Sequence, residues 1–270
     1  MGQQRASDGT AYDLHGPVGA PVVALIHGLG LCRALWDDHI DALAAKYRVL
    51  TYDLYGHGGS TPAPRTPDLR LYSDQLALVL REIGAGPAAI VGFSIGGMIN
   101  RRFAMDHAAQ AACLVIMNSP HNRGETLQQM VEDRAKSVRN QGAMSTMDDA
   151  LKRWFTPEYL AQNGPGLGNG ADLVRRWRGM VDAESYAGAA WVLAHGVREL
   201  VAPTPPITHP ALVLTCENDT GSTPQMTHDI AAEIQGSQTL IIPQLQHLGL
   251  MEHPAAFIRP ILDYLERTLP

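Results

Sequence analysis

The segment Gly92-Phe93-Ser94-Ile95-Gly96-Gly97 is the most informative part of the sequence for predicting the fold. It separates an apolar, strand-like run from a helical pattern over residues 95–105. Where a strand turns abruptly into a helix, a serine at the turn is held in a strained conformation with its hydroxyl exposed. Small residues on both sides leave room for such a turn, and the first N–H groups of the helix point toward charge that develops there. The stretch therefore predicts that Ser94 is a nucleophile.

On both sides of this turn in the sequence, apolar runs alternate with helical patterns. Strands are predicted over residues 21–26, 47–52, 88–93, 111–117, 211–215 and 239–242, and helices over 34–45, 73–83, 95–105, 224–234 and 254–265. Strands that are apolar throughout are buried on both faces, which is typical of parallel sheets covered by helices. This alternation of strands and helices predicts an α/β fold with a doubly wound, mostly parallel sheet.

A long helical segment interrupts the alternation of strands and helices. Between residues 121 and 201 we find helical patterns but no strong strand, with helices expected over 127–139, 147–154, 173–181 and 186–200 and a glycine-rich loop at 164–170. Because strands precede and follow the block, we expect a helical lid inserted into one sheet. The predicted core is residues 1–120 and 202–270, and the predicted lid is residues 121–201.

Composition narrows the classes of function. The chain has 270 residues, 45% of them hydrophobic, and a net charge of −6, which disfavours nucleic-acid binding. The longest apolar run, residues 111–117, is too short for a membrane span, and the first residues have no apolar segment typical of a secretory signal. Three cysteines form no CxxC pair, and the two that lie in strand-like runs are expected to be buried. We expect a soluble cytoplasmic protein without nucleic-acid or membrane partners; its oligomeric state stays open.

A serine nucleophile needs a base, and the base needs an orienting carboxylate. In this type of sheet the chain order is serine, acid, histidine, each after a strand. Asp219 and His247 follow two of the late strands, so we expect them to complete a catalytic triad. Glu217 is the competing acid, but it lies closer to the strand end. His253 is the competing base, but it precedes the proline that opens the last predicted helix.

Two backbone N–H groups are expected to stabilise an oxyanion, those of Leu29 and Ile95. Leu29 lies in the glycine-containing loop that follows the first parallel strand, where the backbone can approach a ligand closely. His27, in the same loop, is expected to have a structural role. Residues 53–60 lack the lysine and spacing of a phosphate-binding loop, so we interpret them as a turn that braces the site. No metal-ligand spacing is found, and no cofactor is expected.

These motifs together resemble the α/β-hydrolase superfamily. Within it, residues 153–158 and 186–190 of the lid resemble 3-oxoadipate enol-lactonases. The resemblance implies a cofactor-independent hydrolase in which Ser94 is acylated and His247 acts as general base and then acid. The expected substrate is a small ester or lactone, such as 3-oxoadipate enol-lactone or a related compound. Two segments depart from the enol-lactonase pattern, residues 121–123 and 191–198, and both are expected near the pocket.

Other functions stay open at this point. A C–C bond hydrolase of meta-cleavage type and a cofactor-free haloperoxidase-like esterase use the same triad, and some triad-bearing relatives are small-molecule receptors. Of the lid aromatics, only Trp154 is expected to line the substrate pocket. Arg123, Arg134 and Arg139 are possible partners of a substrate carboxylate, although a solvated position on the lid surface is the favoured interpretation of each.

Overall fold

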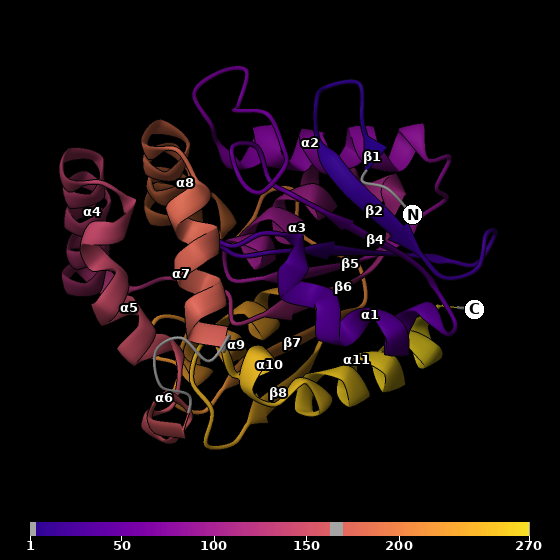
Figure 1. The fold of residues 1–270 in the computed structure, drawn as a ribbon. Helices are drawn as coiled ribbons and strands as arrows, with labels where there is room; N and C mark the ends of the chain where they lie inside the picture. The colour runs from indigo at the N-terminus through magenta and orange to yellow at the C-terminus, as the bar shows by residue number, and fades with distance from the viewer. Residues whose placement is uncertain (1–3, 163–169, 270) are drawn as a thin grey trace.

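A computed structural model describes residues 4–162 and 170–269 of the chain. Its strands form one sheet in the order β1-β2-β4-β3-β5-β6-β7-β8 (Figure 1), and all neighbours from β4 to β8 are parallel. The bounds are β1 Gln4–Arg5, β2 Ala11–His15, β3 Val22–Ile26, β4 Arg48–Tyr52, β5 Ala88–Phe93, β6 Ala111–Met117, β7 Ala211–Cys216 and β8 Gln238–Ile242. The predicted fold class is confirmed.

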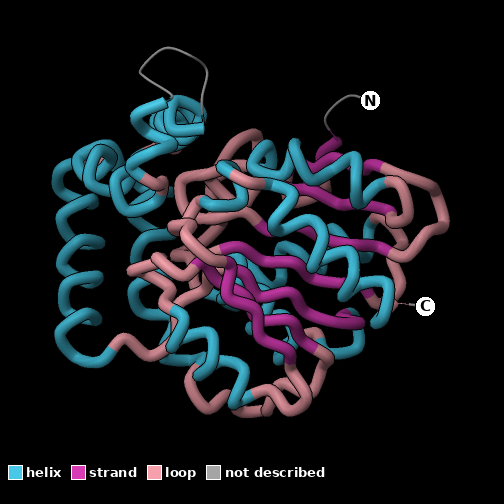
Figure 2. The backbone as a smooth tube through the Cα atoms, turned by 90° about the horizontal axis from the view of Figure 1, so that it is seen from below, coloured by secondary structure: helices cyan, strands magenta, loops and turns pink. Residues whose placement is uncertain are grey.

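Helices cover both faces of this sheet (Figure 2). Those of the core are η1 Arg33–Trp36, α1 Asp37–Ala44, α2 Leu69–Glu82, α3 Ile95–Asp106, η2 Ala108–Gln110, α9 Pro224–Glu233, α10 Gly249–Glu252 and α11 Pro254–Thr268. Successive residues of a buried strand point to opposite faces. Accordingly, Ala24 and Ile26 of β3 pack with α2 and α3, whereas Val23 and Leu25 pack with α1 and α11. Two hydrophobic layers therefore hold the sheet between them.

The helices between β6 and β7 gather at one end of the sheet, on the left in Figure 1. They are α4 Gly124–Gln141, η3 Ala143–Thr146, α5 Met147–Trp154, α6 Pro157–Gln162, α7 Gly170–Met180, α8 Ala183–His195 and η4 Gly196–Leu200. We call this segment the lid; its division from the core at residues 120 and 202 stays a prediction. Among the described residues, no helix is both long and apolar enough to span a membrane.

Several elements differ from the sequence-based expectations. The chain begins with two antiparallel strands, β1 and β2, which were not predicted, and α6 was not predicted either. Helix α2 begins four residues before the expected Ser73, because the Asp68 carboxylate caps it by accepting a hydrogen bond from Leu71 N at 2.7 Å. Most of the expected glycine-rich loop lies outside the described residues.

At the turn between β5 and α3, backbone segments pack so closely that two positions have no space for a side chain. A Cβ atom on Gly92 would lie 2.1 Å from the Gly96 carbonyl oxygen, and one on Gly96 would lie 2.5 Å from the Ile26 oxygen. Both contacts are with backbone, which cannot move aside as the end of a flexible side chain can. Strand β3, strand β5 and helix α3 therefore approach one another through glycine alone.

We expect Gly92→Ala to lower the free energy of unfolding by about 3 kcal/mol or more, because the added methyl group overlaps backbone atoms. The matched control is Gly86→Ala, since no atom lies within 4 Å of a Cβ at that position. Its free energy of unfolding should stay within about 0.5 kcal/mol of the parent's. Urea denaturation of the three proteins measures the difference; equal stability of the two variants would contradict the steric argument.

His39, in α1, is a buried group that the fold leaves without a partner. It is 1% exposed, packs edge-on against Trp36, and its ring nitrogens have no hydrogen-bond partner within the described residues. Burial lowers the pKa of His39 to about 4 from 6.5. Between these two values the unfolded chain binds a proton that the folded protein does not. Stability is therefore lost as the pH falls through this range.

We expect His39→Leu to raise the free energy of unfolding at pH 7 by about 1–3 kcal/mol, since it removes unsatisfied polar atoms from the core. It should also remove a loss of about 2 kcal/mol that the parent suffers between pH 7 and pH 5. The exposed His228 serves as control, and His228→Leu should leave both values nearly unchanged. Chemical denaturation at the two pH values tests this, and a destabilised His39→Leu protein would contradict it.

Candidate active site

Ser94 lies at the turn between β5 and α3, as the sequence predicts. Its φ and ψ angles are 58° and −116°, a backbone conformation that residues other than glycine rarely adopt. The Ser94 N–H donates to the Met117 oxygen of β6 at 2.9 Å, which anchors the turn to the sheet. The side chain lines a cavity between the core and the lid. The strain therefore coincides with a position where the hydroxyl can meet a ligand.

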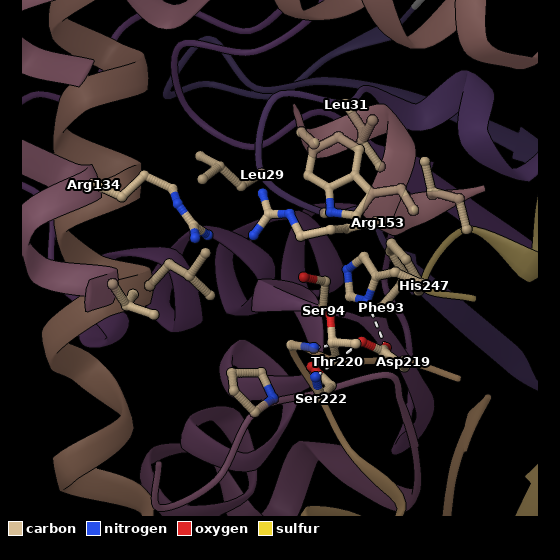
Figure 3. A pocket seen from close by; sticks show the side chains of 18 of the residues that line it. Leu29, Leu31, Phe93, Ser94, Arg134, Arg153, Asp219, Thr220, Ser222 and His247 are labelled. Carbon is tan, nitrogen blue, oxygen red and sulfur yellow. Dashed lines mark hydrogen bonds and ion pairs between the residues drawn. The ribbon is translucent and has the colours of Figure 1, made fainter. Parts of the chain in front are cut away.

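Asp219 and His247 lie beside this turn, at the ends of β7 and β8. His247 Nδ1 is 2.6 Å from Asp219 Oδ2, and Figure 3 shows the imidazole between Asp219 and Ser94. Phe93 and Trp154 hold the ring, with centroids 4.9 and 6.0 Å from that of His247. No hydrogen bond joins Ser94 to His247 in the described part of the chain. The structure thus brings the three predicted residues together.

Four hydrogen bonds fix the Asp219 carboxylate. Besides His247, Asn118 Nδ2 donates to Oδ2 at 3.0 Å, and the N–H groups of Gly221 and Ser222 both donate to Oδ1 at 2.9 Å. Burial alone would raise the pKa of Asp219, but the charge and hydrogen bond of His247, with those of Asn118 and Ser222, hold the pKa below its usual value. The carboxylate therefore stays ionised and can accept the His247 Nδ1–H.

The two competing residues lie elsewhere. Glu217 is exposed, and its carboxylate accepts a hydrogen bond from Gln244 N at 2.9 Å. It therefore ties two loops together at the surface. His253 is the residue that directly precedes α11. Neither lines the cavity that holds Ser94.

The expected oxyanion donors lie on two loops that meet at Ser94. Leu29 lines the cavity, and Ile95 is the first residue of α3, so its N–H has no partner within the helix. Within the described residues, neither N–H makes a hydrogen bond. Gly96 packs against the carbonyl groups of Ile26 and His27, which places the start of α3 directly on the loop that carries Leu29.

Two buried histidines brace the loop after β3, which carries Leu29. His57 Nε2 accepts a hydrogen bond from Gly30 N at 3.1 Å, and His27 Nε2 accepts one from Leu54 N at 3.0 Å. Burial, with a smaller effect of His57, lowers the pKa of His27 to about 4, and burial also lowers the pKa of His57. Both rings are therefore neutral near pH 7, as an accepting nitrogen requires. This is the structural role expected for His27.

The turn at residues 53–60 supports the same loop. The Asp53 carboxylate accepts hydrogen bonds from Arg33 N at 2.7 Å and Gly59 N at 2.8 Å, and it forms an ion pair with the Arg33 guanidinium. Ser60 Oγ donates to the Asp53 carbonyl oxygen at 2.6 Å. All of these contacts are internal to the protein, which agrees with a bracing turn. No group of three or more potential metal ligands occurs in the described ranges.

The cavity has a volume of about 890 Å³, including its open mouth, and the lid supplies most of one wall. Trp154 lies in this wall, whereas Trp191 stacks on His195 outside it. The arginine interpretation needs correction: Arg123 and Arg134 line the cavity instead of a solvated surface. Of the three proposed arginines, only Arg139 lies on the outer surface.

Two more arginines, Arg153 and Arg178, line the cavity and were not singled out from the sequence. Arg178 is 2% exposed, and its guanidinium lies 4.6 Å from the centre of the Tyr186 ring. A Cβ on Gly30, in the loop after β3, would lie 2.8 Å from that ring and 3.3 Å from Arg178 Cγ. Arg178 and Tyr186 thus join the lid to the loop that carries Leu29. No spacing in the sequence indicates which face of a lid helix turns inward.

Comparison with known proteins agrees with this architecture. Residues 23–259 match the model of the alpha/beta hydrolase family. The chain is 25% identical over 265 residues to (E)-2-((N-methylformamido)methylene)succinate hydrolase of Acinetobacter baylyi, covering 98% of this chain and 97% of the relative. It is 28% identical over 254 residues to 3-oxoadipate enol-lactonase 1 of the same organism, covering 92% and 90%.

A solved structure, the enol-lactonase from Burkholderia xenovorans LB400, superposes with a TM-score of 0.87 at 25% identity, covering 98% of this chain and all of the other. The family match spans most of the chain, from β3 to α11. The similarity to enol-lactonases expected from the sequence is confirmed. The chain therefore belongs to the alpha/beta hydrolase family.

Proposed function

We propose that the protein is a serine hydrolase that cleaves a small carboxylic ester or lactone through an acyl-enzyme. The observation that carries the proposal is the 2.6 Å contact between Asp219 and His247 beside the strained Ser94. A base held by an ionised carboxylate, next to a serine hydroxyl that lines a cavity, is the arrangement that activates a serine. Relatives named as enol-lactonases support the lactone as substrate.

In the proposed mechanism, Ser94 Oγ attacks the substrate carbonyl carbon while His247 Nε2 takes the hydroxyl proton. The N–H groups of Leu29 and Ile95 donate to the oxyanion that forms. The tetrahedral intermediate collapses, and His247 gives its proton to the leaving oxygen. With a lactone this oxygen remains part of the acyl group. Water, deprotonated by His247, then attacks the acyl-enzyme and releases the acid with Ser94 regenerated.

Asp219 remains an anion throughout this cycle. It holds the Nδ1–H tautomer of His247, so that Nε2 faces Ser94, and it stabilises the imidazolium that forms in each half-reaction. Its bonds to Gly221 and Ser222 keep it in place without protonation. All three roles of the reaction are thus assigned to side chains that line one cavity.

Ser94→Ala should abolish hydrolysis of 3-oxoadipate enol-lactone, lowering the rate at least about a thousandfold, because no other group can accept the acyl chain. Loss of the lactone's ultraviolet absorbance measures the rate. The control is Ser73→Ala, which removes another buried serine hydroxyl, far from the cavity and without a hydrogen-bond partner in the described chain. Ser73→Ala should keep the parent rate.

If the parent consumes no lactone, the same proteins are assayed with simple aryl esters, with meta-cleavage diketones and for halide-dependent peroxide oxidation. Preference for a diketone would replace the lactonase by a C–C hydrolase, and peroxidase activity would favour the haloperoxidase-like esterase. Ligand-dependent thermal stabilisation without turnover would favour a receptor. An active Ser94→Ala protein would contradict the proposed nucleophile.

Asp219→Asn should lower kcat by about 10⁴-fold with little change in KM, because an amide favours the wrong His247 tautomer. Glu217→Gln is the matched control for the other acid of this loop, and it should stay close to the parent rate. Steady-state kinetics on one ester, with circular dichroism to check folding, give both values. A larger effect of Glu217→Gln than of Asp219→Asn would reverse the assignment of the acid.

A further inference from the structure

Four arginines face the cavity above Ser94, and the described residues pair none of them with a carboxylate. They are Arg123, Arg134, Arg153 and Arg178. Figure 3 shows Arg134 of α4 and Arg153 of α5 directed toward one another across the cavity, close to Leu29 and above Ser94. Such a cluster carries several positive charges next to the proposed reacting carbonyl.

The protein's own hydrogen bonds use only part of these guanidinium groups. Arg134 makes none within the described ranges, and Arg153 donates only through Nε, to the Asp149 carbonyl oxygen at 3.1 Å. Arg178 donates through Nη2 to Thr146 Oγ1 at 2.6 Å, while its buried Nε has no partner. Unused N–H donors therefore remain on three arginines that line one cavity.

Arg123 is different, because both of its terminal nitrogens donate to other residues of the protein. Its Nη2 donates to the Leu193 carbonyl oxygen at 3.1 Å, and its Nη1 donates to Gln128 Oε1 at 3.2 Å and to the Ala194 oxygen at 3.4 Å. These bonds tie the start of α4 to the end of α8. We therefore assign Arg123 a structural role and leave the other three for the ligand.

Electrostatics favour an anion at this place. Burial lowers the pKa of Arg153 and of Arg178, and the nearby charge of Arg134 lowers both further. Among the described residues that line the cavity, Asp219 is the one with a carboxylate, and His247 already binds it. Partly desolvated guanidinium groups that repel one another are stabilised when a bound anion supplies the missing negative charge.

We propose that the substrate carries two free carboxylates in addition to the ester or lactone bond, one bound between Arg134 and Arg153 and the other by Arg178. Planar guanidinium groups match carboxylates through paired hydrogen bonds, and three of them on three different helices suit two separated anionic groups. All three guanidinium groups line the same cavity as Ser94 and His247. This inference rests on the proposed hydrolase function and adds the chemical class of its substrate.

The test uses three 4-nitrophenyl esters that share a leaving group and differ in free carboxylates. They are the acetate with none, the hydrogen succinate with one, and a terminal monoester of propane-1,2,3-tricarboxylic acid with two. We expect kcat/KM of the parent to rise about tenfold or more with each carboxylate, mainly through a lower KM. Equal values for the three esters, together with an inactive Ser94→Ala protein, would overturn this inference and leave the hydrolase proposal standing.

Arg134→Met and Arg153→Met should each reduce the preference for the two-carboxylate ester over the acetate about tenfold or more. Arg139→Met is the control, because Arg139 lies on the same helix as Arg134 but on the outer surface, with only a 4.0 Å contact to Glu184. It should keep the parent preference. A preference that survives Arg134→Met and Arg153→Met together would exclude the proposed anion site.

Binding gives a readout that does not depend on turnover. We expect propane-1,2,3-tricarboxylate to bind the Ser94→Ala protein in calorimetry, with Kd raised about tenfold or more by Arg134→Met. Inorganic phosphate, the comparison anion, should bind more weakly. Absence of tricarboxylate binding, or equally strong binding of phosphate, would contradict the carboxylate assignment. If the parent hydrolyses none of the esters but this binding is found, the anion site stands and the hydrolase proposal fails.

Discussion

The close approach of three backbone segments at Gly92 and Gly96 is the constraint on which the site depends. A Cβ on Gly96 would lie 2.5 Å from the Ile26 oxygen, so α3 can start here only because the position carries no side chain. That contact places the first N–H of α3 beside the loop after β3. It also holds Ser94 in a backbone conformation with a positive φ angle. Such a conformation costs about 1–3 kcal/mol, and the packing of the surrounding sheet compensates for this cost. The positions of Ser94 and of the N–H groups of Leu29 and Ile95 thus depend on one close backbone contact.

Around this turn the protein separates neutral, negative and positive groups. His27 and His57 are buried and neutral, so they can brace the loop that carries Leu29 without adding charge next to it. The negative charge of Asp219 is directed to His247 and to two backbone N–H groups. The lid supplies the positive charges. The oxyanion of the proposed mechanism would therefore meet N–H donors on one side and, among the described residues, no uncompensated carboxylate on the other.

The core was predictable because its strands are short, apolar and bounded by turn residues; β5 was predicted to the residue. The rule that parallel strands build sites at their carboxyl ends likewise indicated Asp219 and His247. The early strands β1 and β2 were missed because an antiparallel edge strand mixes polar and apolar residues. The inward-facing arginines were missed for another reason. Periodicity defines the faces of α4 and α5, but only tertiary packing decides which face meets the cavity.

The arginines also connect stability with specificity. Burial of guanidinium groups costs free energy unless an anion binds them, as the lowered pKa values of Arg153 and Arg178 indicate. A substrate with carboxylates relieves this cost, whereas a neutral ester of the same shape leaves the charges buried and unpaired. A site rejects a substrate that leaves its buried polar groups unpaired more strongly than it rejects one that only fits a hydrophobic pocket less well. On the proposed substrate class, a lid of this composition selects substrates chiefly by excluding those without negative charge.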